Sequence, residues 1–272
     1  MLGAGSVPAR AHPSLFVAVP TTAGTGSEVS DSAIVYVPRT IYKAVMRAPH
    51  LAPAVALLDP ELGVTAPAEV TATAGYDAMT HAVEAYVSRA ATPLMDPLAL
   101  TAIAALARHL PVAFARPDDI VARGACLIAS TQAGIAFNSA HLGMAHAVAG
   151  SLGALHHVPH GLTNALALPM TMTMTMAFCA PSLVDKAPSL AAALGAPSVA
   201  GGLARLRHGL GLDRGLDAYV PDAGARDRLA KAAMTSGQIA MSPRRPTPAQ
   251  MRSLIEAMRV PGGREAPELS EI

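Results

Sequence analysis

Residues Thr65–Tyr86 read TAPAEVTATAGYDAMTHAVEAY, and they mark the point where the chain changes from strand-like to helical sequence. Thr65, followed by Pro67 and Glu69, has the residue types that favour the first turn of a helix. The residues after this start are rich in alanine. We therefore expect a long helix over 66–88.

The sequence after this helix keeps the same character. Long segments rich in alanine and leucine follow one another, and several open with N-terminal signals such as Asp118 and Asp119, or Thr247 and Pro248. These patterns predict an all-helical region with helices over 66–88, 95–114, 118–139, 141–154, 160–178, 187–194, 199–210, 223–239 and 247–258.

The sequence before Thr65 has a different pattern. Three short apolar runs, rich in valine, each stop at a proline or at Asp59-Pro60. Runs of this length bounded by turn formers predict β-strands. We expect strands over 15–19, 33–37 and 54–58, and hence a small strand-containing region followed by a mostly helical one.

The composition excludes several classes of protein. The chain has 272 residues, of which 51% are hydrophobic and 14% charged, with a net charge of +1. This is a compact globular profile without the charge that nucleic acid or an anionic membrane attracts. Cys126 and Cys179 form no CxxC pair, and no signal-peptide pattern opens the chain, so we expect a cytoplasmic protein. The uncharged stretch 161–184 is long enough for a bilayer, but its threonines and prolines favour a buried segment.

One candidate for chemistry lies within the first helix. Asp77 and His81 are four residues apart, so a helix places them on one face, among apolar and small residues. A carboxylate and an imidazole aimed together suit a cation such as Fe²⁺ or Zn²⁺. The alternative is an ordinary polar pair on a solvated face, but a buried carboxylate needs a partner.

Histidines gather in a second segment, where five lie between His141 and His160. Two helices joined by a short loop would present His146 and His160 to one point. With Asp77 and His81, they would supply three imidazoles and a carboxylate. The alternative is a group of helix-end histidines bonded to backbone carbonyls, and the presence of the first pair favours the metal interpretation.

A loop of small residues follows the first expected strand. Residues 19–28 read VPTTAGTGSE, and their backbone N–H groups and hydroxyls could approach a phosphate closely. The segment is neither a GxGxxG fingerprint nor a Walker loop. On composition alone, a plain glycine-rich turn is the better interpretation.

Together these segments resemble the iron-containing (group III) alcohol dehydrogenases, which share a fold with glycerol dehydrogenase and dehydroquinate synthase. The resemblance runs from about residue 13 to residue 258 and rests on PTTAGTGSE at 20–28, GYDAMTHAVEAY at 75–86, the spacing from His146 to VPHG at 158–161, and SPRRPT at 242–247. It implies the α/β remnant of a dinucleotide-binding domain over 1–64 and an all-α metal-binding catalytic domain over 65–272.

The resemblance also assigns roles to individual residues. The positions that match the family's metal ligands are Asp77, His81, His146 and His160. Those that match its dinucleotide contacts are Thr21, Thr22, Thr25 and Ser27, with Lys43 placed by its spacing near the nicotinamide ribose. The implied activity is hydride transfer between an alcohol and NAD or NADP, giving an aldehyde or ketone, with Fe²⁺ or Zn²⁺ as the metal. We expect a homo-oligomer that takes a small-molecule substrate.

The first departure from the family concerns a histidine. The family usually has one four residues after the His146 position, thought to help relay a proton, and here Gly150 stands there. His141 lies about 140° round a helix from His146, so it is not a simple replacement. We consider His156 or His157 as side chains that approach the site from the loop.

The second departure lies before the loop. Only 20 residues precede Thr21, whereas the family places most of a nucleotide-binding sheet and a GGGSxxD segment there. The expected strands would leave an exposed sheet edge. A truncated metal-binding fragment without a working cofactor site is therefore the alternative function. A metal hydrolase with Glu84 as its general base is a weaker one.

Overall fold

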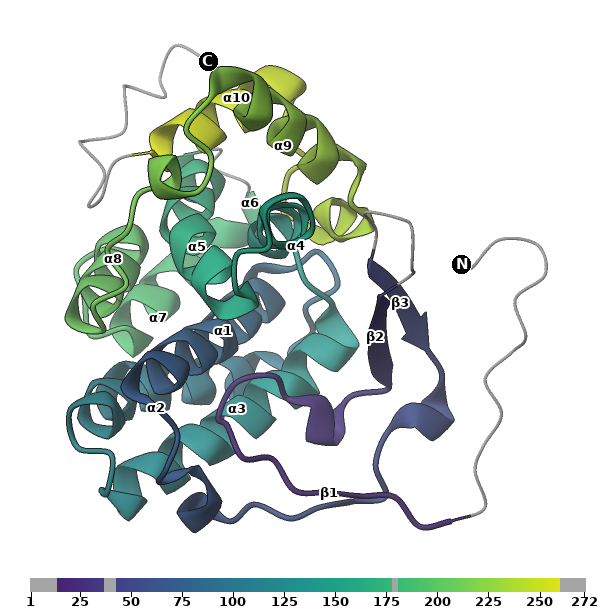
Figure 1. The fold of residues 1–272 in the computed structure, drawn as a ribbon, viewed down its shortest axis with the longest axis vertical. Helices are drawn as coiled ribbons and strands as arrows, with labels where there is room; N and C mark the ends of the chain where they lie inside the picture. Colours follow the sequence, from purple (N-terminus) through teal and green to yellow (C-terminus); the bar gives the residue numbers. More distant parts are fainter. Residues whose placement is uncertain (1–13, 37–42, 178–180, 260–272) are drawn as a thin grey trace.

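The computed structural model describes residues 14–36, 43–177 and 181–259, and most of these residues are helical (Figure 1). Short strands occupy the first part of the chain, and α-helices fill the sequence from Ala68 onward. The expected fold class, a small α/β part followed by a mostly helical part, is confirmed. The division into two domains at residue 64 stays a prediction.

Helix α1, Ala68–Val87, lies in the middle of the helical part (Figure 1). Every residue from Gly75 to Val87 is buried, which is typical of a core helix surrounded by other elements. It packs against α2, α3, α4 and α5. The remaining helices are α2 (Asp96–Ala115), α3 (Ile120–Ala140), α4 (Met144–His156), α5 (His160–Ala177), α6 (Pro181–Val184), α7 (Lys186–Ala193), α8 (Val199–Gly209), α9 (Ala223–Thr235) and α10 (Pro248–Ala257).

Two helix boundaries differ from the expected ones by more than two residues, and one short helix was not expected. His141 ends α3 with φ at 62°, so the helix expected over 141–154 begins only at Met144. The helix expected over 223–239 stops at Thr235, where Ser236 is extended, and a 3₁₀ turn, Gly237–Met241, follows. The short helix α6 was not predicted, because four residues carry too little periodic pattern.

The strands form two small sheets. β1 (Val17–Ala18) pairs in parallel with β4 (Val55–Ala56), and β2 (Ser32–Tyr36) pairs antiparallel with β3 (Lys43–Arg47). The strands expected over 15–19 and 54–58 are thus shorter than predicted. β3 was missed, because its apolar run is only three residues long between two basic ones.

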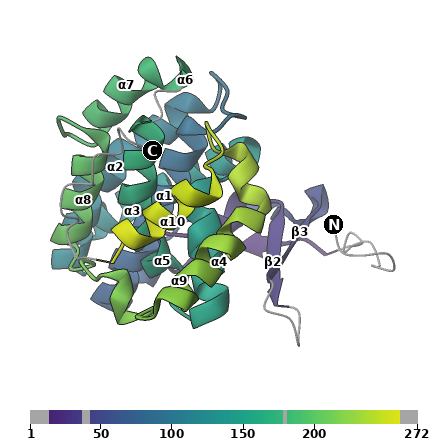
Figure 2. The same cartoon turned by 90° about the horizontal axis from the view of Figure 1, so that it is seen from above.

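Apolar side chains on these strands are largely exposed. Ile34 and Val45 are 64% and 52% exposed, in contrast to the core of the helical part. The β2–β3 hairpin projects from one side of the helices (Figures 1 and 2). Its attachment includes polar contacts: Arg47 Nη2 lies 2.8 Å from Asp31 Oδ1 and 2.9 Å from the carbonyl oxygen of Asn138 on α3.

Two described helices, α2 and α3, are long and apolar enough to cross a bilayer by length and composition alone. In this fold they pack against α1 and against each other, and side chains such as Ile103 and Leu106 are fully buried. Within the described part of the uncharged stretch 161–184, α5 is buried continuously from Leu162 to Pro169. Core packing thus accounts for only part of the apolar composition of α2 and α3, because 33% and 50% of their most apolar stretches are buried.

Candidate metal centre

Helix α1 presents three polar side chains along one face. Asp77, His81 and Glu84 follow the i, i+4, i+7 spacing of that face, and each is 5% exposed. Buried carboxylates and imidazoles are unfavourable unless they find partners. The partners come from the first turns of α4 and α5 and from the loop that precedes β2.

The Asp77 carboxylate is the point at which the four predicted ligands meet. Its Oδ1 atom lies 3.6 Å from Nε2 of His146, 3.6 Å from Nε2 of His160 and 3.8 Å from Nε2 of His81. The His81 and His146 rings stack with their centroids 4.8 Å apart. Three helices thus bring together the four side chains singled out in the sequence.

Glu84 fixes the first turn of α4. Its carboxylate accepts hydrogen bonds from the backbone N–H groups of Gly143 (3.0 Å), Ala145 (2.6 Å) and His146 (3.3 Å), which lack partners within the helix. Nδ1 of His146 lies 2.7 Å from the same carboxylate. Because a carboxylate only accepts, Nδ1 carries the hydrogen, and Nε2 is the ring nitrogen that faces Asp77.

These four donors also bear on the hydrolase alternative. A general base needs a lone pair directed at a reacting water. Both oxygens of Glu84 are already engaged by donors at the start of α4. Glu84 is therefore better explained as the residue that orients His146.

Asn164 is a further polar group at the centre that the sequence analysis did not select. It is fully buried one turn after His160 on α5, and its Nδ2 donates to Asp77 Oδ1 at 2.5 Å. Nδ2 also lies 3.2 Å from His146 Nε2 and 3.3 Å from His160 Nε2. The i+4 spacing from His160 was the available signal, because it places Asn164 on the same helix face.

The two most deeply buried imidazoles shift in opposite directions. Burial lowers the pKa of His81 to about 4, against the opposing charge of Asp77. Burial acts in the same sense on His146, but hydrogen bonds to Asp77 and Glu84 outweigh it and raise its pKa to about 9. Burial would raise the pKa of Asp77, yet the surrounding imidazoles hold it well below its usual range. Asp77 is thus ionised and available to a cation.

The centre opens to solvent on one side. The His160 side chain is 40% exposed, whereas those of Asp77, His81 and His146 are between 2% and 7% exposed. A small molecule would therefore reach the centre past His160, at the start of α5. The other three side chains form its closed floor.

The loop at 19–28 alternates between buried and exposed residues. Gly24, Gly26 and Glu28 are buried, whereas Thr25 and Ser27 are exposed. Among the other predicted dinucleotide contacts, Thr21 is exposed and Thr22 is half-buried. Lys43 begins β3, and the placement of its side chain lies outside the described part of the chain.

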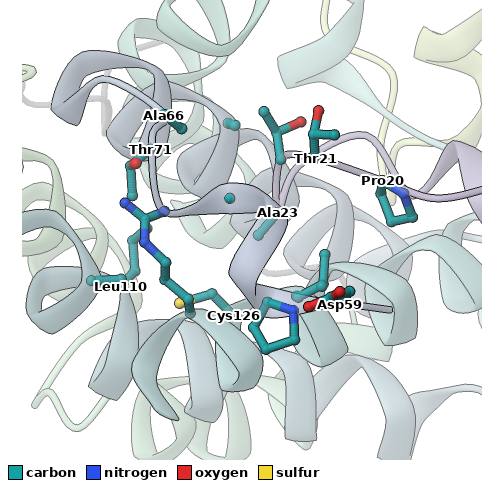
Figure 3. A pocket seen from close by; sticks show the side chains of 15 residues that line it. Pro20, Thr21, Ala23, Asp59, Ala66, Thr71, Leu110 and Cys126 are labelled. Carbon is teal, nitrogen blue, oxygen red and sulfur yellow. The ribbon is translucent and has the colours of Figure 1, made fainter. Parts of the chain in front are cut away.

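A cavity of about 30 Å³ lies beside this loop (Figure 3). It is lined by Pro20–Ala23, by Thr71 and Ala74 of α1, and by residues of α2 and α3 that include Cys126. Its volume admits a water-sized molecule and not a nucleotide. None of the four predicted ligands lines it, so we place the centre at Asp77.

The remaining histidines lie differently from what the sequence predicted. His141 lies outside both helices, and its Nδ1 is 2.6 Å from Arg47 Nη1, so the helical geometry assumed for it was wrong. His156 has Arg228 and Asp222 as charged neighbours. The approach of His156 or His157 to the centre stays a prediction. A Cβ added at Gly150 would meet no atom within 4 Å, so that position faces open space.

The donor set suits a divalent cation. One carboxylate oxygen and three imidazole nitrogens are ligands that Zn²⁺ and Fe²⁺ both accept. Tetrahedral bonds of about 2.0–2.2 Å place neighbouring ligand atoms about 3.4 Å apart. The observed separations of 3.6–3.8 Å from Asp77 Oδ1 are close to that value. Asp77, His146 and His160 offer ligand atoms that all lie within 4.8 Å of one another, so these three residues fit such an ion, whereas His81 lies near Asp77 but outside that group.

Comparison with known proteins finds relatives along nearly the whole chain. Residues 71–259 match the model "Fe-containing alcohol dehydrogenase family, C-terminal", and residues 2–60 match the model "Iron-containing alcohol dehydrogenase". The chain is 45% identical over 163 residues to the probable alcohol dehydrogenase EutG of Escherichia coli. This alignment covers 60% of this chain and 41% of EutG. It is 46% identical to the 1,3-propanediol dehydrogenase of Klebsiella pneumoniae, over 56% of this chain and 40% of that one.

Solved structures with the same arrangement include a 1,3-propanediol oxidoreductase. It has a TM-score of 0.81 at 34% identity, covering 88% of this chain and 65% of that one. An iron-containing alcohol dehydrogenase from Thermococcus thioreducens has a TM-score of 0.83 at 31% identity, covering 94% and 67%. The chain thus spans about two fifths of the length of the curated relatives in these alignments.

Proposed function

The chain belongs to the iron-containing alcohol dehydrogenase family, and from that membership we propose that it binds a divalent cation and interconverts an alcohol and its aldehyde or ketone with NAD or NADP. The observation that carries the proposal is the meeting of Asp77 Oδ1 with three imidazole nitrogens at 3.6–3.8 Å. Relatives named as alcohol dehydrogenases support the same activity.

Each residue of the centre has a part in this proposal. When bound, the cation supplies Lewis-acid stabilisation of a negatively charged substrate oxygen, and the nicotinamide supplies the hydride acceptor. Asp77, His81, His146 and His160 would hold the cation. Glu84 keeps the lone pair of His146 directed inward, and Asn164 holds the Asp77 carboxylate in place.

Substrate and dinucleotide would meet at the open side of the centre. The exposed His160 edge admits a small alcohol, and the buried floor excludes water from the other sides. The Thr21, Thr22, Thr25, Ser27 and Lys43 positions would contact the dinucleotide. Relatives named for methanol, 1-propanol, 1,3-propanediol and butanol support a short alcohol as the substrate.

Different parts of the chain would supply the two sides of the active site. We assign residues 1–64 to the dinucleotide side and 65–272 to the metal side of one active site, in a cytoplasmic homo-oligomer. Fe²⁺ and Zn²⁺ both suit the ligands, so metal availability would decide between them. The alternative is a metal-binding fragment without a working cofactor site.

The test is metal content and nucleotide binding in ligand variants. Asp77→Asn and His160→Ala should weaken Zn²⁺ binding by roughly 100-fold or more, beyond the 10–100-fold typical of outer-shell changes. His208→Ala, which removes an 80% exposed imidazole on α8 that pairs with Asp213, is the control and should keep full occupancy by elemental analysis. Full occupancy in the ligand variants would reject the centre. Metal binding without any NADH or NADPH binding, followed by fluorescence, would favour the fragment.

A further inference from the structure

The predicted cofactor loop touches one predicted metal ligand directly. Nδ1 of His81 lies 3.2 Å from the backbone carbonyl oxygen of Gly24, and both residues are buried. A carbonyl oxygen only accepts, so Nδ1 carries the hydrogen and Nε2 keeps its lone pair toward Asp77. The Gly24 carbonyl thus orients the His81 ring as the Glu84 carboxylate orients the His146 ring. Gly24 lies on a loop, and its carbonyl carries no charge.

The buried face of this loop is held in close contact with two helices. A Cβ added at Gly24 would lie 2.9 Å from the Cβ of Ala74 on α1, closer than such atoms approach. Gly26 has φ at 61°, and a Cβ there would lie 2.6 Å from the Cα of Gly134 on α3. These glycines therefore serve close packing on the helices, which sets the position of the Gly24 carbonyl.

A carboxylate adds a third anchor to the same face. Glu28 is 2% exposed, and its Oε1 accepts from the Thr131 hydroxyl on α3 at 2.6 Å. The opposite face of the loop carries the exposed Thr25 and Ser27, whose hydroxyls lie 3.0 Å apart. One short segment therefore has an inner face on the metal centre and an outer face with two exposed hydroxyl groups.

We propose that the loop Pro20–Glu28 positions His81 through the Gly24 carbonyl and thereby couples dinucleotide binding to metal binding. The coupling half rests on the proposed function, because it requires a dinucleotide on the outer face. A ligand that contacts Thr25 and Ser27 on the outer face would act on the same short loop that carries the Gly24 carbonyl on its inner face. By thermodynamic linkage, a dinucleotide that tightens metal binding by some factor is itself bound more tightly by the same factor when the metal is present.

The positioning half is tested by Zn²⁺ and Co²⁺ affinity in a Gly24→Ala variant. We expect affinity to fall about 10–100-fold, the range for a group that orients a ligand, and the visible spectrum of bound Co²⁺ to change. Gly209→Ala, where an added Cβ meets nothing within 4 Å, is the matched control and should leave both unchanged. Unchanged metal affinity in Gly24→Ala would overturn the proposal.

Two further variants separate positioning from general damage to the fold. Ala74→Gly removes the atom nearest to the added Cβ, so Gly24→Ala/Ala74→Gly should recover part of the lost affinity. In a His81→Ala background, Gly24→Ala should have no further effect on the residual affinity, because its target is gone. An equal loss with and without His81 would show that the loop acts by another route, and would reject the inference.

The coupling half is tested by measuring Zn²⁺ affinity with and without saturating NAD⁺ or NADP⁺. We expect a tightening of about 5-fold or more in the unmodified chain, within the usual range for coupled sites, and a smaller one in Gly24→Ala. Nucleotide binding that leaves Zn²⁺ affinity unchanged would overturn the coupling alone. Absence of nucleotide binding would reject both the coupling and the proposed function, while the Gly24 result would still decide the positioning half.

Discussion

The strand region and the helical region of this chain use the same residue types to opposite effect. Leu57, just after β4, is 50% exposed, whereas Leu106 on α2 is completely buried. Both come from apolar runs that the sequence pattern marks as parts of a core. The difference arises because a two-stranded sheet has too few neighbours to cover its faces, whereas α1 is surrounded by other helices.

The predicted functional residues are also divided between the helical region and the strand region. All four predicted ligands lie on helices of the densely packed part, where Glu84 and Asn164 can hold them in place. The predicted dinucleotide contacts lie on the strand side, mostly on exposed surface. The metal half of the proposed site is thus rigidly supported by this fold, and the loop at Gly24 is its direct link to the other half.

Removal of the Glu84 carboxylate should give the largest effect that tests this contrast between the helical and strand regions. Glu84→Leu leaves three backbone N–H groups and the Nδ1–H of His146 without their acceptor. At about 1–3 kcal/mol for each buried unpaired donor, we expect a loss of roughly 4 kcal/mol or more in unfolding free energy. Denaturant unfolding measures this loss, and Zn²⁺ affinity should fall about 10–100-fold in parallel.

Glu84→Gln is the matched control for that variant. The amide retains one oxygen acceptor but directs an NH₂ group at the remaining donors, so both losses should be intermediate. If Glu84→Leu were as stable as the unmodified chain, the start of α4 would not depend on this carboxylate. The rigid support claimed for the metal half would then be wrong.

A pair of leucine truncations gives the next largest effect. Leu106→Ala opens a cavity in a fully packed core and should lower the unfolding free energy by about 2–5 kcal/mol. Leu57→Ala removes the same atoms from a half-exposed position and should cost less than about 1 kcal/mol. Comparable losses in thermal or denaturant unfolding would mean that the strand region is covered in solution.

Most helices and the Asp77–His81 pair could be predicted because they depend on local periodicity. Spacing alone placed Asp77 and His81 on one face, and the helix start at His160 was predicted correctly, whereas the start of the helix with His146 was placed three residues too early. The predicted helices α1, α2 and α3 match the observed ones closely, since long amphipathic or apolar segments give a strong pattern.

The rest depends on contacts between distant segments, which a single sequence does not specify. The bond from Gly24 to His81 joins residues 57 positions apart, and that from Glu84 to His146 joins residues 62 apart. β3 was missed because its short run becomes a strand only by pairing with β2. His141 was misplaced because its φ of 62° is set by the junction of α3 and α4, which periodicity cannot reveal.

The smallest predicted effect concerns the attachment of the hairpin to the helical part. Arg47 reaches Asp31, Asn138 and His141 from β3, but the Arg47 and Asp31 side chains are 34% and 24% exposed, so solvent screens much of their attraction. Arg47→Ala should therefore cost only about 0.2–1 kcal/mol of global stability. It should nevertheless speed amide hydrogen exchange in β2 and β3, because few apolar contacts hold these strands, while the amides of α1 and α5 stay protected. Exchange that accelerates equally in α1 would show that the hairpin and the helices unfold as one unit, and the contrast between the two regions would then be one of exposure and not of stability.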